Sequence, residues 1–438
     1  MEESKKRKIK TCAYCTLGCK VNSYDTDAMR AVMEESGYIT VPFSDIADVY
    51  VINTCSVTHI SDRKSRQMIS RAHTKNPDAI IIVAGCYAKT APEVVSALPG
   101  VNIVLGTNDR KKVADILNSY IAENRNHALT YTADDTAFEE LSADESDKTR
   151  AYLKIQDGCN RFCSYCIIPY ARGRIRSRSL ESTKNELLRL AEKGYKEVVL
   201  TGIHLMSYGL DLDGVDIVDA IALSKDIDGI KRVRLGSLDP DFITDKFVKA
   251  VSENKKVCRQ FHLSLQSGSN TVLKRMNRRY TAEQYKDAVM RLRRAMPDCA
   301  ITTDIIAGFA GETDLEHEET LKFVDEIGFA RVHVFPYSER RGTVAAKMPD
   351  QVSPEIKERR AHEIAKAAEM TQKQYMQSFI GRRVEVLFEE AQGEFLRGYT
   401  DTYIDVLAKA GAELVNEIKS VEVKEAYGTH LVGDIVED

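Results

Sequence analysis

The sequence predicts an α/β protein with an N-terminal parallel α/β domain, a central full or partial (β/α) barrel and a small C-terminal β-barrel. Three observations predict this fold class. Apolar, strand-like runs alternate with helix-like stretches in the first part of the chain, and a second alternating series follows an acidic segment. After Gly381, strand-like runs dominate. Alternating strands and helices are typical of parallel sheets and (β/α) barrels, and successive short strands are typical of small β-barrels.

The N-terminal domain is expected over residues 1–133. Residues 50–55 and 79–86 form short β-branched runs, and each run ends in a cysteine. The polar, Arg/Lys-rich stretch 61–75 between them fits a surface helix, which implies parallel strands with helical crossovers. Ligands gather beyond the carboxyl ends of such strands. Cys55 and Cys86 are therefore expected at that edge, and Cys19 falls at the end of a predicted first strand.

Residues 134–148 are predicted to form an acidic linker. Seven of the fourteen residues from 134 to 147 are Asp or Glu, which is typical of a solvated segment. The central part is expected over residues 149–373. Its predicted strands are 196–202, 231–237, 260–266, 300–309 and 330–338. Enough chain separates each pair for a helix, so the carboxyl end of a (β/α) barrel is the expected active-site face.

Ser353 and Pro354 predict the start of a long helix, with Ser as the N-cap and Pro at the first helical position. Six residues recur at helical spacing and predict its buried face: Ile356, Ile364, Ala368, Thr371, Tyr375 and Phe379. The small β-barrel is expected over residues 374–438, a segment with six Lys/Arg and thirteen Asp/Glu.

The composition excludes several classes of protein. The formal net charge is −4, so no basic field covers the whole molecule. The first ten residues are mostly charged, and no apolar run approaches the about 18 residues of a membrane span. We therefore expect a cytoplasmic protein without a secretory signal or a membrane anchor. Its ten cysteines are clustered, which favours metal ligands or catalysts over disulfides in such a protein.

The strongest chemical signal is the segment DGCNRFCSYC, which places Cys159, Cys163 and Cys166 in a C-x3-C-x2-C spacing. Three thiolates on one loop can hold three irons of a 4Fe–4S cluster and leave the fourth iron open to another ligand. Structural zinc is the alternative. It normally takes four protein ligands, and no fourth Cys or His follows nearby.

This spacing, directly before a (β/α) series, resembles the radical-SAM superfamily, whose open iron binds S-adenosylmethionine. The segments TLGCKVNSYDTD, INTCSVT and AGCYA, around Cys19, Cys55 and Cys86, are similar to the N-terminal domain of the methylthiotransferase family. The segments KIQDGCNRFCSYCIIPYARGRIRSR, TGIHLMSYG, FHLSLQSGSNTVLKRMNRRYT and HVFPYSERRGT resemble the same family. The C-terminal region resembles its TRAM domain, an RNA-binding β-barrel. The resemblance covers essentially the whole chain.

The resemblance implies a radical-SAM barrel and two 4Fe–4S clusters. Cys159, Cys163 and Cys166 would hold the radical cluster, and Cys19, Cys55 and Cys86 would hold an auxiliary one. From the residues alone, a cysteine at a strand end is equally compatible with a small core residue.

The same resemblance implies contacts to S-adenosylmethionine. Tyr165 would lie beside the adenine, and Thr201 with Gly202 would hold the amino group. Gln266, Asp304 and the glycines of GFAGE, Gly308 and Gly311, lie at later strand ends. Turn formation is the alternative role for each of these. The family usually has proline where Ala310, Glu339 and Arg341 stand, and these changes loosen turns without removing a reactive group.

Methylthiotransferases insert sulfur at an unactivated C–H bond and methylate it, which requires a radical because such a bond has no usable acidity. The implied mechanism uses two molecules of S-adenosylmethionine, one as methyl donor to a sulfide on the auxiliary cluster and one as source of the 5′-deoxyadenosyl radical. LGCKVN, residues 17–22, resembles the subgroup that acts on threonylcarbamoyladenosine next to the tRNA anticodon. After the cysteine, the isopentenyladenosine subgroup more typically has glutamine and the ribosomal-protein subgroup has proline.

The expected partners are therefore the anticodon stem-loop of tRNA, a low-potential electron donor and a sulfur donor. The first alternative is the same chemistry on isopentenyladenosine or on a ribosomal protein side chain. A non-catalytic protein that binds metal and RNA is an alternative of another class.

Arginines are the candidate contacts to RNA and substrate. Four of them stand within seven residues after the cluster loop: Arg172, Arg174, Arg176 and Arg178. Their guanidinium groups suit phosphate, although a solvated surface run is the alternative. Arg172, Arg174, Arg340 and Arg341 are candidates for the substrate carboxylate. Because the C-terminal segment is acidic, RNA binding there would need a local patch such as Arg382, Arg383 and Arg397.

Four cysteines remain. Cys12 and Cys15 form C-x2-C-x3-C with Cys19, which by itself indicates a local metal loop, but the family pattern selects only Cys19. Cys258 and Cys299 precede predicted strands without metal-like spacing, and we interpret them as structural.

Overall fold

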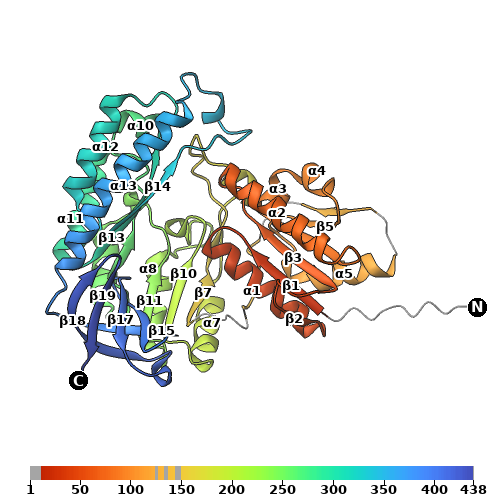
Figure 1. The fold of residues 1–438 in the computed structure, drawn as a ribbon, viewed down its shortest axis with the longest axis horizontal. Coiled ribbons are helices and arrows are strands. Elements are labelled where there is room, and N and C mark those ends of the chain that lie inside the picture. Colours follow the sequence, from red (N-terminus) through yellow and green to blue (C-terminus); the bar gives the residue numbers. More distant parts are fainter. Residues whose placement is uncertain (1–10, 124–126, 133–136, 144–148, 438) are drawn as a thin grey trace, which may run out of the picture.

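The computed structural model describes residues 11–123, 127–132, 137–143 and 149–437. Figure 1 shows three parts that follow the chain in order: an N-terminal α/β part, a central part of strands and helices, and a C-terminal barrel. Within the described ranges, no helix is both long and apolar enough to cross a membrane.

The N-terminal part is a six-stranded sheet in the order β2-β1-β3-β4-β5-β6, and all of its strand pairs are parallel. Every residue of β3 is buried, and its side chains alternate between two hydrophobic clusters, one on each face of the sheet. The predicted parallel α/β domain is confirmed. Its strands are β1 (Thr11–Thr16), β2 (Ile39–Val41), β3 (Val49–Thr54), β4 (Ile80–Gly85), β5 (Val101–Leu105) and β6 (Leu129–Tyr131). Its helices are α1 (Lys20–Glu35), α2 (His59–Lys75), α3 (Cys86–Thr90), α4 (Pro92–Ser96) and α5 (Val113–Ala122).

The central part is an open (β/α) barrel. Two three-stranded parallel sheets, β11-β10-β7 and β12-β13-β14, are joined by parallel bridges at Val233–Val257 and Leu238–Leu263. Its strands are β7 (Arg150–Lys154), β10 (Glu197–Thr201), β11 (Arg232–Leu235), β12 (Gln260–His262), β13 (Ala300–Ala307) and β14 (Arg331–Pro336). The five predicted strands are present, and the predicted partial barrel is confirmed. The first strand, β7, was not predicted.

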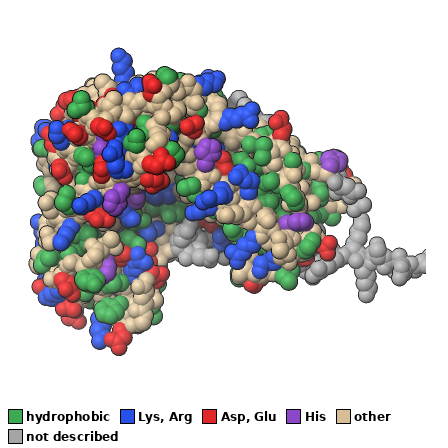
Figure 2. Space-filling model, turned by 45° about the horizontal axis from the view of Figure 1, so that its top comes forward, with side chains coloured by type: hydrophobic (Ala, Val, Ile, Leu, Met, Phe, Trp, Pro, Cys, Tyr) green, Lys and Arg blue, Asp and Glu red, His purple; other side chains and the backbone are tan. Residues whose placement is uncertain are grey.

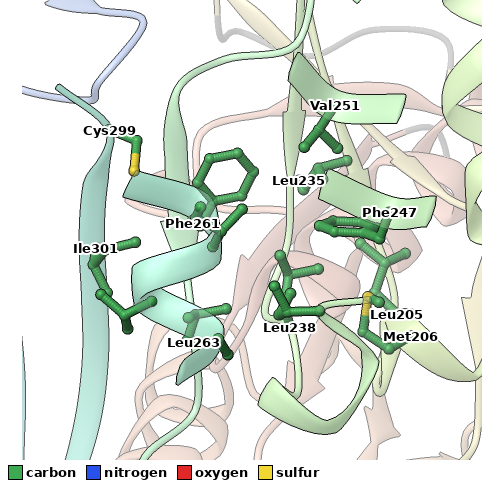
Figure 3. Packing of buried hydrophobic residues seen from close by; sticks show 14 of the residues in the cluster. Leu205, Met206, Leu235, Leu238, Phe247, Val251, Phe261, Leu263, Cys299 and Ile301 are labelled. Carbon is green, nitrogen blue, oxygen red and sulfur yellow. The ribbon is translucent and has the colours of Figure 1, made fainter. Parts of the chain in front are cut away.

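Helices cover the outside of this barrel (Figure 1). They are α7 (Leu180–Glu192), α8 (Ile217–Ala222), α9 (Asp245–Glu253), α10 (Asn270–Arg275), α11 (Ala282–Ala295) and α12 (Asp314–Ile327). A short hairpin of β8 (Gln156–Asp157) and β9 (Arg176–Ser177) flanks α6 (Ile168–Arg172). Figure 3 shows part of the barrel core, in which Leu235 lies beside Phe247 and Val251 of α9, while Phe261 and Ile301 lie near Leu263. Cys299 packs in this core.

The long helix α13 (Pro354–Gln377) begins as predicted, because the Ser353 side chain accepts a hydrogen bond from the Ile356 backbone N–H. Its predicted buried face is wrong at one position. Ile356 is 37% exposed, whereas Lys357 is only 9% exposed. The aliphatic stem of Lys357 packs over Gly308: a Cβ placed on that glycine would lie 2.5 Å from Lys357 Cγ. A long side chain therefore fills the space that a glycine leaves open.

The C-terminal part is a closed antiparallel and parallel barrel in the order β15-β16-β17-β19-β18, which confirms the predicted small β-barrel. Its strands are β15 (Arg383–Gln392), β16 (Phe395–Thr400), β17 (Asp405–Lys409), β18 (Ile418–Tyr427) and β19 (His430–Ile435). Met376 and Phe379, at the end of α13, belong to its core. Arg234 of β11 fixes the barrel to the central part by donating to the Asp401 carbonyl at 2.9 Å.

The predicted acidic linker is described only over residues 137–143, and the rest of it lies outside the described residues. The prediction that this segment is solvated is wrong at Glu139 and Leu141, whereas Ala137, Glu140 and Ser142 are exposed. Glu139 is buried and pairs with Arg110 Nη1 at 3.0 Å, and Leu141 is buried against Tyr24 of α1. A buried guanidinium needs a carboxylate partner, and the linker supplies one. The predicted boundaries at 133, 148 and 373 stay predictions.

Candidate active site with two cysteine trios

The first trio lies on the loop between β8 and α6. Gly158 has φ +73°, and a Cβ there would lie 1.8 Å from the Arg174 carbonyl oxygen, so the loop requires glycine at its start. The Cys159 backbone N–H donates to the Gly173 carbonyl at 3.0 Å, and the Ser164 hydroxyl donates to the Arg275 carbonyl at 2.8 Å. Both ends of the loop are thus fixed to neighbouring segments.

Cys159, Cys163 and Cys166 line one cavity of about 640 Å³. Burial, followed by the charge of the neighbouring Cys163, raises the pKa of the Cys166 thiol to about 12. The two thiols are therefore close together, and a bound cation is what would stabilise their thiolate forms. The donor set fits the cysteine ligands of an iron–sulfur cluster.

The second trio lies at the carboxyl edge of the N-terminal sheet. Cys19 precedes α1, Cys55 follows β3, and Cys86 is the first residue of α3 after β4. The loop before Cys19 crosses Cys55 closely: a Cβ on Gly18 would lie 3.0 Å from Cys55 Sγ. Burial raises the pKa of Cys86 to about 11, while Arg172 acts in the opposite direction. The three cysteines predicted to hold the auxiliary cluster therefore lie at the carboxyl ends of three neighbouring strands, β1, β3 and β4.

The second trio meets the space around the first trio at Cys19. Cys19 lines the cavity of Cys159, Cys163 and Cys166, and with Cys55 it also lines an adjoining chamber of about 810 Å³. Figure 2 shows the hollow between the N-terminal part and the rest of the molecule, with Lys and Arg side chains at its rim. A substrate in this space would lie beside Cys159, Cys163 and Cys166 and beside Cys19 of the second trio.

Each trio supplies three cysteines, the number of protein ligands that a 4Fe–4S cluster with one open iron takes. Across the residues that the structure describes, no three Cys, His, Asp or Glu side chains converge tightly enough to hold one metal ion. In a 4Fe–4S cluster, each cysteine binds a different iron atom, so the ligands surround a larger volume. Three cysteines at each position, without a fourth, leave one iron open to another ligand.

The predicted cofactor residues line the same cavity: Tyr165, Thr201, Gly202, Gln266 and Asp304. Gly202 follows β10, and a Cβ there would lie 2.8 Å from Gln156 Oε1, so this backbone edge stays open only with glycine. Gln266 holds φ +70°, a strained conformation for a residue with a Cβ. Their individual roles toward S-adenosylmethionine stay predictions.

Gly308 and Gly311, unlike the predicted cofactor residues, do not line this cavity. Both have positive φ, at +68° and +69°, and Lys357 covers Gly308. The Gly311 N–H donates to the Asp350 carbonyl at 2.8 Å. Their geometry is explained by turn formation, which was the alternative role for them.

A polar network beside the first trio was not predicted. Arg278 Nη1 lies 3.3 Å from Cys163 Sγ, and Arg278 Nη2 pairs with Asp239 at 3.1 Å. Asp239 also accepts from the His204 ring at 3.2 Å. Arg278 lies in one of the motifs that carry the family resemblance, but the adjacent Arg279 looks equivalent in the sequence. Only the fold separates the buried arginine from the exposed one.

Lys20, directly after Cys19, also lines the cavity and was missed as a site residue. Burial lowers its pKa to about 8, and the nearby cations Arg234 and Arg150 act in the same direction. The sequence places this lysine in a subgroup motif, but it does not show which way the side chain points.

Four of the six arginines predicted to contact RNA or substrate are buried and paired within the protein, so those predictions are wrong. Arg172 pairs with Asp25 and Asp157, each at 3.0 Å. Arg340 pairs with Asp62 at 2.6 Å. The other two are Arg176 and Arg178, which are 4% and 3% exposed. Because these arginines lie where the N-terminal and central parts meet, carboxylates and carbonyls of the protein take the place expected for phosphate.

Arg174 and Arg341 are exposed, and their contact with RNA or substrate stays a prediction. Arg174 lies over the Phe162 ring at 5.3 Å. In the C-terminal patch, Arg397 pairs with Asp405 at 2.6 Å and Arg382 pairs with Asp298 at 3.0 Å. Arg383 is exposed at the start of β15.

The other cysteines occupy core positions. Cys12 is fully buried in β1, and burial raises its pKa to about 12. Cys15 packs against the hydrophobic cluster on the opposite face of the sheet. Cys258 and Cys299 are buried, as a structural role requires.

Two family models match the chain. The Radical SAM superfamily matches residues 153–324, and the uncharacterized protein family UPF0004 matches residues 11–106. Among solved structures, the radical S-adenosylmethionine methyltransferase TsrM from Kitasatospora setae has a TM-score of 0.56 at 15% identity, covering 77% of this chain and 75% of that one. This likeness supports the fold alone.

Curated relatives match over nearly their whole length. The threonylcarbamoyladenosine tRNA methylthiotransferase MtaB of Bacillus subtilis is 42% identical, covering 97% of this chain and 96% of the relative. The protein of the same name from Thermotoga maritima is 37% identical, with 95% of each chain covered. The tRNA-2-methylthio-N(6)-dimethylallyladenosine synthase of Clostridium novyi is 35% identical, covering 96% of this chain and 95% of the relative. With these relatives matched over nearly their whole length, and with Cys19 on the same cavity as Cys159, Cys163 and Cys166, the chain belongs to the radical-SAM methylthiotransferase family.

Proposed function

We propose that this protein converts threonylcarbamoyladenosine next to the tRNA anticodon into its 2-methylthio derivative, with S-adenosylmethionine and two 4Fe–4S clusters. The observation that carries the proposal is that Cys19 lines the same cavity as Cys159, Cys163 and Cys166. Sulfur insertion at a C–H bond requires the sulfur source and the radical source to reach one atom, and a shared cavity permits this. The relatives named above support the choice of substrate.

In this proposal, the residues of the chain bind and orient the reactants. Cys159, Cys163 and Cys166 would hold the cluster that binds S-adenosylmethionine, whose reductive cleavage supplies a radical able to abstract hydrogen from an unactivated C–H bond. Tyr165 would pack against the adenine, and Thr201 with Gly202 would present a polar backbone edge to the amino group.

The chain would also hold the auxiliary cluster, with Cys19, Cys55 and Cys86 as its ligands. Arg278, which touches Cys163, places a cation beside the radical cluster and so counters part of its negative charge. Arg172 does the same near Cys86. Gln266 and Asp304 offer further polar groups to the ligand.

The proposal also assigns the partners. The anticodon stem-loop would lie over the mouth of the cavity, with the exposed Arg174 and Arg341 available to its phosphates and the C-terminal barrel as a second contact. A low-potential electron donor and a sulfur donor are required, because each turnover consumes an electron at the radical cluster and one sulfur atom. We place this reaction in the cytoplasm, with its tRNA substrate.

A second candidate function is the same reaction on isopentenyladenosine. It is supported by the relative from Clostridium novyi, which is named for the dimethylallyl substrate. The apolar side chains Val57, Phe335 and Pro336 in the adjoining chamber would suit such a substituent.

Matched anticodon stem-loops carrying threonylcarbamoyladenosine, isopentenyladenosine or plain adenosine distinguish the two. We expect the reconstituted enzyme to thiomethylate the threonylcarbamoyl form with the highest kcat/KM, measured by mass spectrometry of the nucleosides. Faster thiomethylation of the isopentenyl form would overturn the choice of substrate and leave the chemistry standing. No thiomethylation of any stem-loop would overturn the proposed function.

A further inference from the structure

The chamber beside the central cavity is a distinct space with its own chemistry. It has a volume of about 810 Å³ and lies between Cys19 and Cys55 on one side and the end of β14 with the start of α13 on the other. It shares Cys19, Val57 and Phe335 with the central cavity. A group that extends from a base in the central cavity can therefore enter it.

Lys357 lines this chamber and is the buried cation that the fold leaves without an acidic partner there. The residue is only 9% exposed, and within the described residues its ammonium has neither an ion pair nor a hydrogen bond. Its contact is the face of Tyr337, whose ring centroid lies 5.0 Å from Nζ. Tyr337 lines the same chamber, and its buried hydroxyl has no hydrogen-bond partner.

This arrangement costs stability in the free protein. A buried ammonium without a carboxylate loses hydration, which the face of the Tyr337 ring replaces only in part. Lys357 also stands near the N-terminus of α13, where the helix dipole disfavours positive charge. The same dipole favours an anion in the chamber. An anionic ligand would pair with the ammonium and remove both penalties.

We propose that Lys357 binds the carboxylate of the threonylcarbamoyl group and thereby selects this substrate over an uncharged one. The inference rests on the proposed function. The reacting carbon of the base has to lie between the two cysteine trios, so the substituent on its exocyclic nitrogen has to extend away from them. The chamber offers that substituent an apolar wall and one buried cation at its far side. A neutral isopentenyl group would fit the wall but leave Lys357 unpaired.

Other charged groups near the cavity suit this role less well. Arg172 and Arg340 already have carboxylate partners. Lys20 lines the central cavity beside Cys19 rather than the chamber. Glu339 and Glu358 also line the chamber and oppose an anion, but both are exposed, so solvent and salt screen their charge.

The test compares Lys357→Met with the wild-type enzyme on two stem-loops, one carrying threonylcarbamoyladenosine and one carrying isopentenyladenosine. Lys366→Met, an exposed lysine of the same helix, is the matched control. We expect Lys357→Met to lower the ratio of the two kcat/KM values by on the order of 10- to 100-fold, since the substrate carboxylate loses its partner. Lys366→Met should keep the wild-type ratio.

Two further measurements separate this role from a structural one. The melting temperature of Lys357→Met should equal or exceed that of the wild type, because a buried unpaired charge is removed. A stem-loop carrying the methyl ester of threonylcarbamoyladenosine should be a poor substrate for the wild type, and Lys357→Met should lower its kcat/KM no further.

Each remaining outcome has a definite meaning. If Lys357→Met lowers kcat/KM equally for all stem-loops, the lysine contacts the RNA backbone and the inference is overturned. If only Lys20→Met abolishes the preference, the carboxylate lies in the central cavity and the inference is also overturned. If the wild type itself prefers the isopentenyl form, the proposed function fails before Lys357 is tested.

Discussion

Arg172 lies fully buried where the cluster loop meets the N-terminal part. Its guanidinium pairs with Asp25 and Asp157, and Asp25 pairs in addition with Arg110 and Lys154 at 3.0 and 2.6 Å. Burial alone would raise the pKa of the Asp25 carboxyl, but Arg110, Lys154 and Arg172 hold it below its ordinary value. This network joins α1 to the loop that carries Cys159, so it fixes the position of one trio relative to the other.

Replacement of Arg172 by Met should therefore act through stability. It leaves buried carboxylates short of one cation, and we expect the free energy of unfolding to fall by about 3–5 kcal/mol. Denaturant unfolding of the apoprotein measures this loss. Arg174→Met is the matched control, two residues away and exposed, and it should change stability by no more than about 0.5 kcal/mol. Equal, small effects of the two variants would contradict the structural role of Arg172.

Arg174 should act on RNA affinity instead. If it contacts a phosphate, Arg174→Met weakens stem-loop binding similarly for every sequence and lowers the slope of log K against log salt by about 1. Fluorescence anisotropy over a range of salt concentrations measures both quantities. An unchanged salt slope would show that Arg174 makes no phosphate contact. The alternating arginines look alike in the sequence because their spacing does not reveal which of them face a buried carboxylate.

The geometry of strand β1 distinguishes two interpretations of the C-x2-C-x3-C motif, a local metal loop or Cys19 alone as a ligand. Cys12 and Cys15 stand three residues apart, so on an extended strand they point to opposite faces of the sheet. Cys12 lies in the core on one face, and Cys15 packs against the cluster on the other. Of the three cysteines in the C-x2-C-x3-C motif, Cys12 and Cys15 therefore lie within the strand and Cys19 lies in the loop after it. Only Cys19 of these three lines the cavity.

Replacement of both Cys12 and Cys15 by Ala should leave the iron content and the turnover nearly unchanged after anaerobic reconstitution. The expected loss is in stability only, roughly 1 kcal/mol for each buried side chain that is shortened. Cys19→Ala serves as the comparison, because it removes a proposed ligand of the auxiliary cluster. A halved iron content in the double variant would mean that the local cysteines hold the auxiliary cluster.

Helices and strands differ in how far the sequence predicts them. The five predicted barrel strands are present, and each carries apolar residues that pack in or against the barrel core. Strand β7 was missed, since Arg150 and Lys154 at its ends conceal a short buried strand whose charges are paired. In α13, helical spacing predicts a buried Ile356, but Gly308 opens a gap that Lys357 fills. Tertiary gaps of this kind leave no trace in local sequence.

At the scale of the whole molecule, the N-terminal part lies against the central barrel so that Cys19 lines the same cavity as Cys159, Cys163 and Cys166, which are far from it in the sequence. Arg340 of the central part pairs with Asp62 of α2, and the His59 backbone N–H donates to the Ser338 hydroxyl at 3.1 Å. Each trio was predictable from its motif and its strand ends. The position of Cys19 on the cavity of the first trio, and the buried cation in the adjoining chamber, depend on packing between domains, which sequence periodicity does not encode.

The iron content of the reconstituted protein tests the central claim most directly. Anaerobic reconstitution should give about eight irons per chain, in two clusters of four. Replacing Cys159, Cys163 and Cys166 together by Ala should leave about four irons and abolish 5′-deoxyadenosine formation. Replacing Cys19, Cys55 and Cys86 should also leave about four irons but retain some cleavage of S-adenosylmethionine. A colourless protein that binds zinc and no iron after reconstitution would contradict the account.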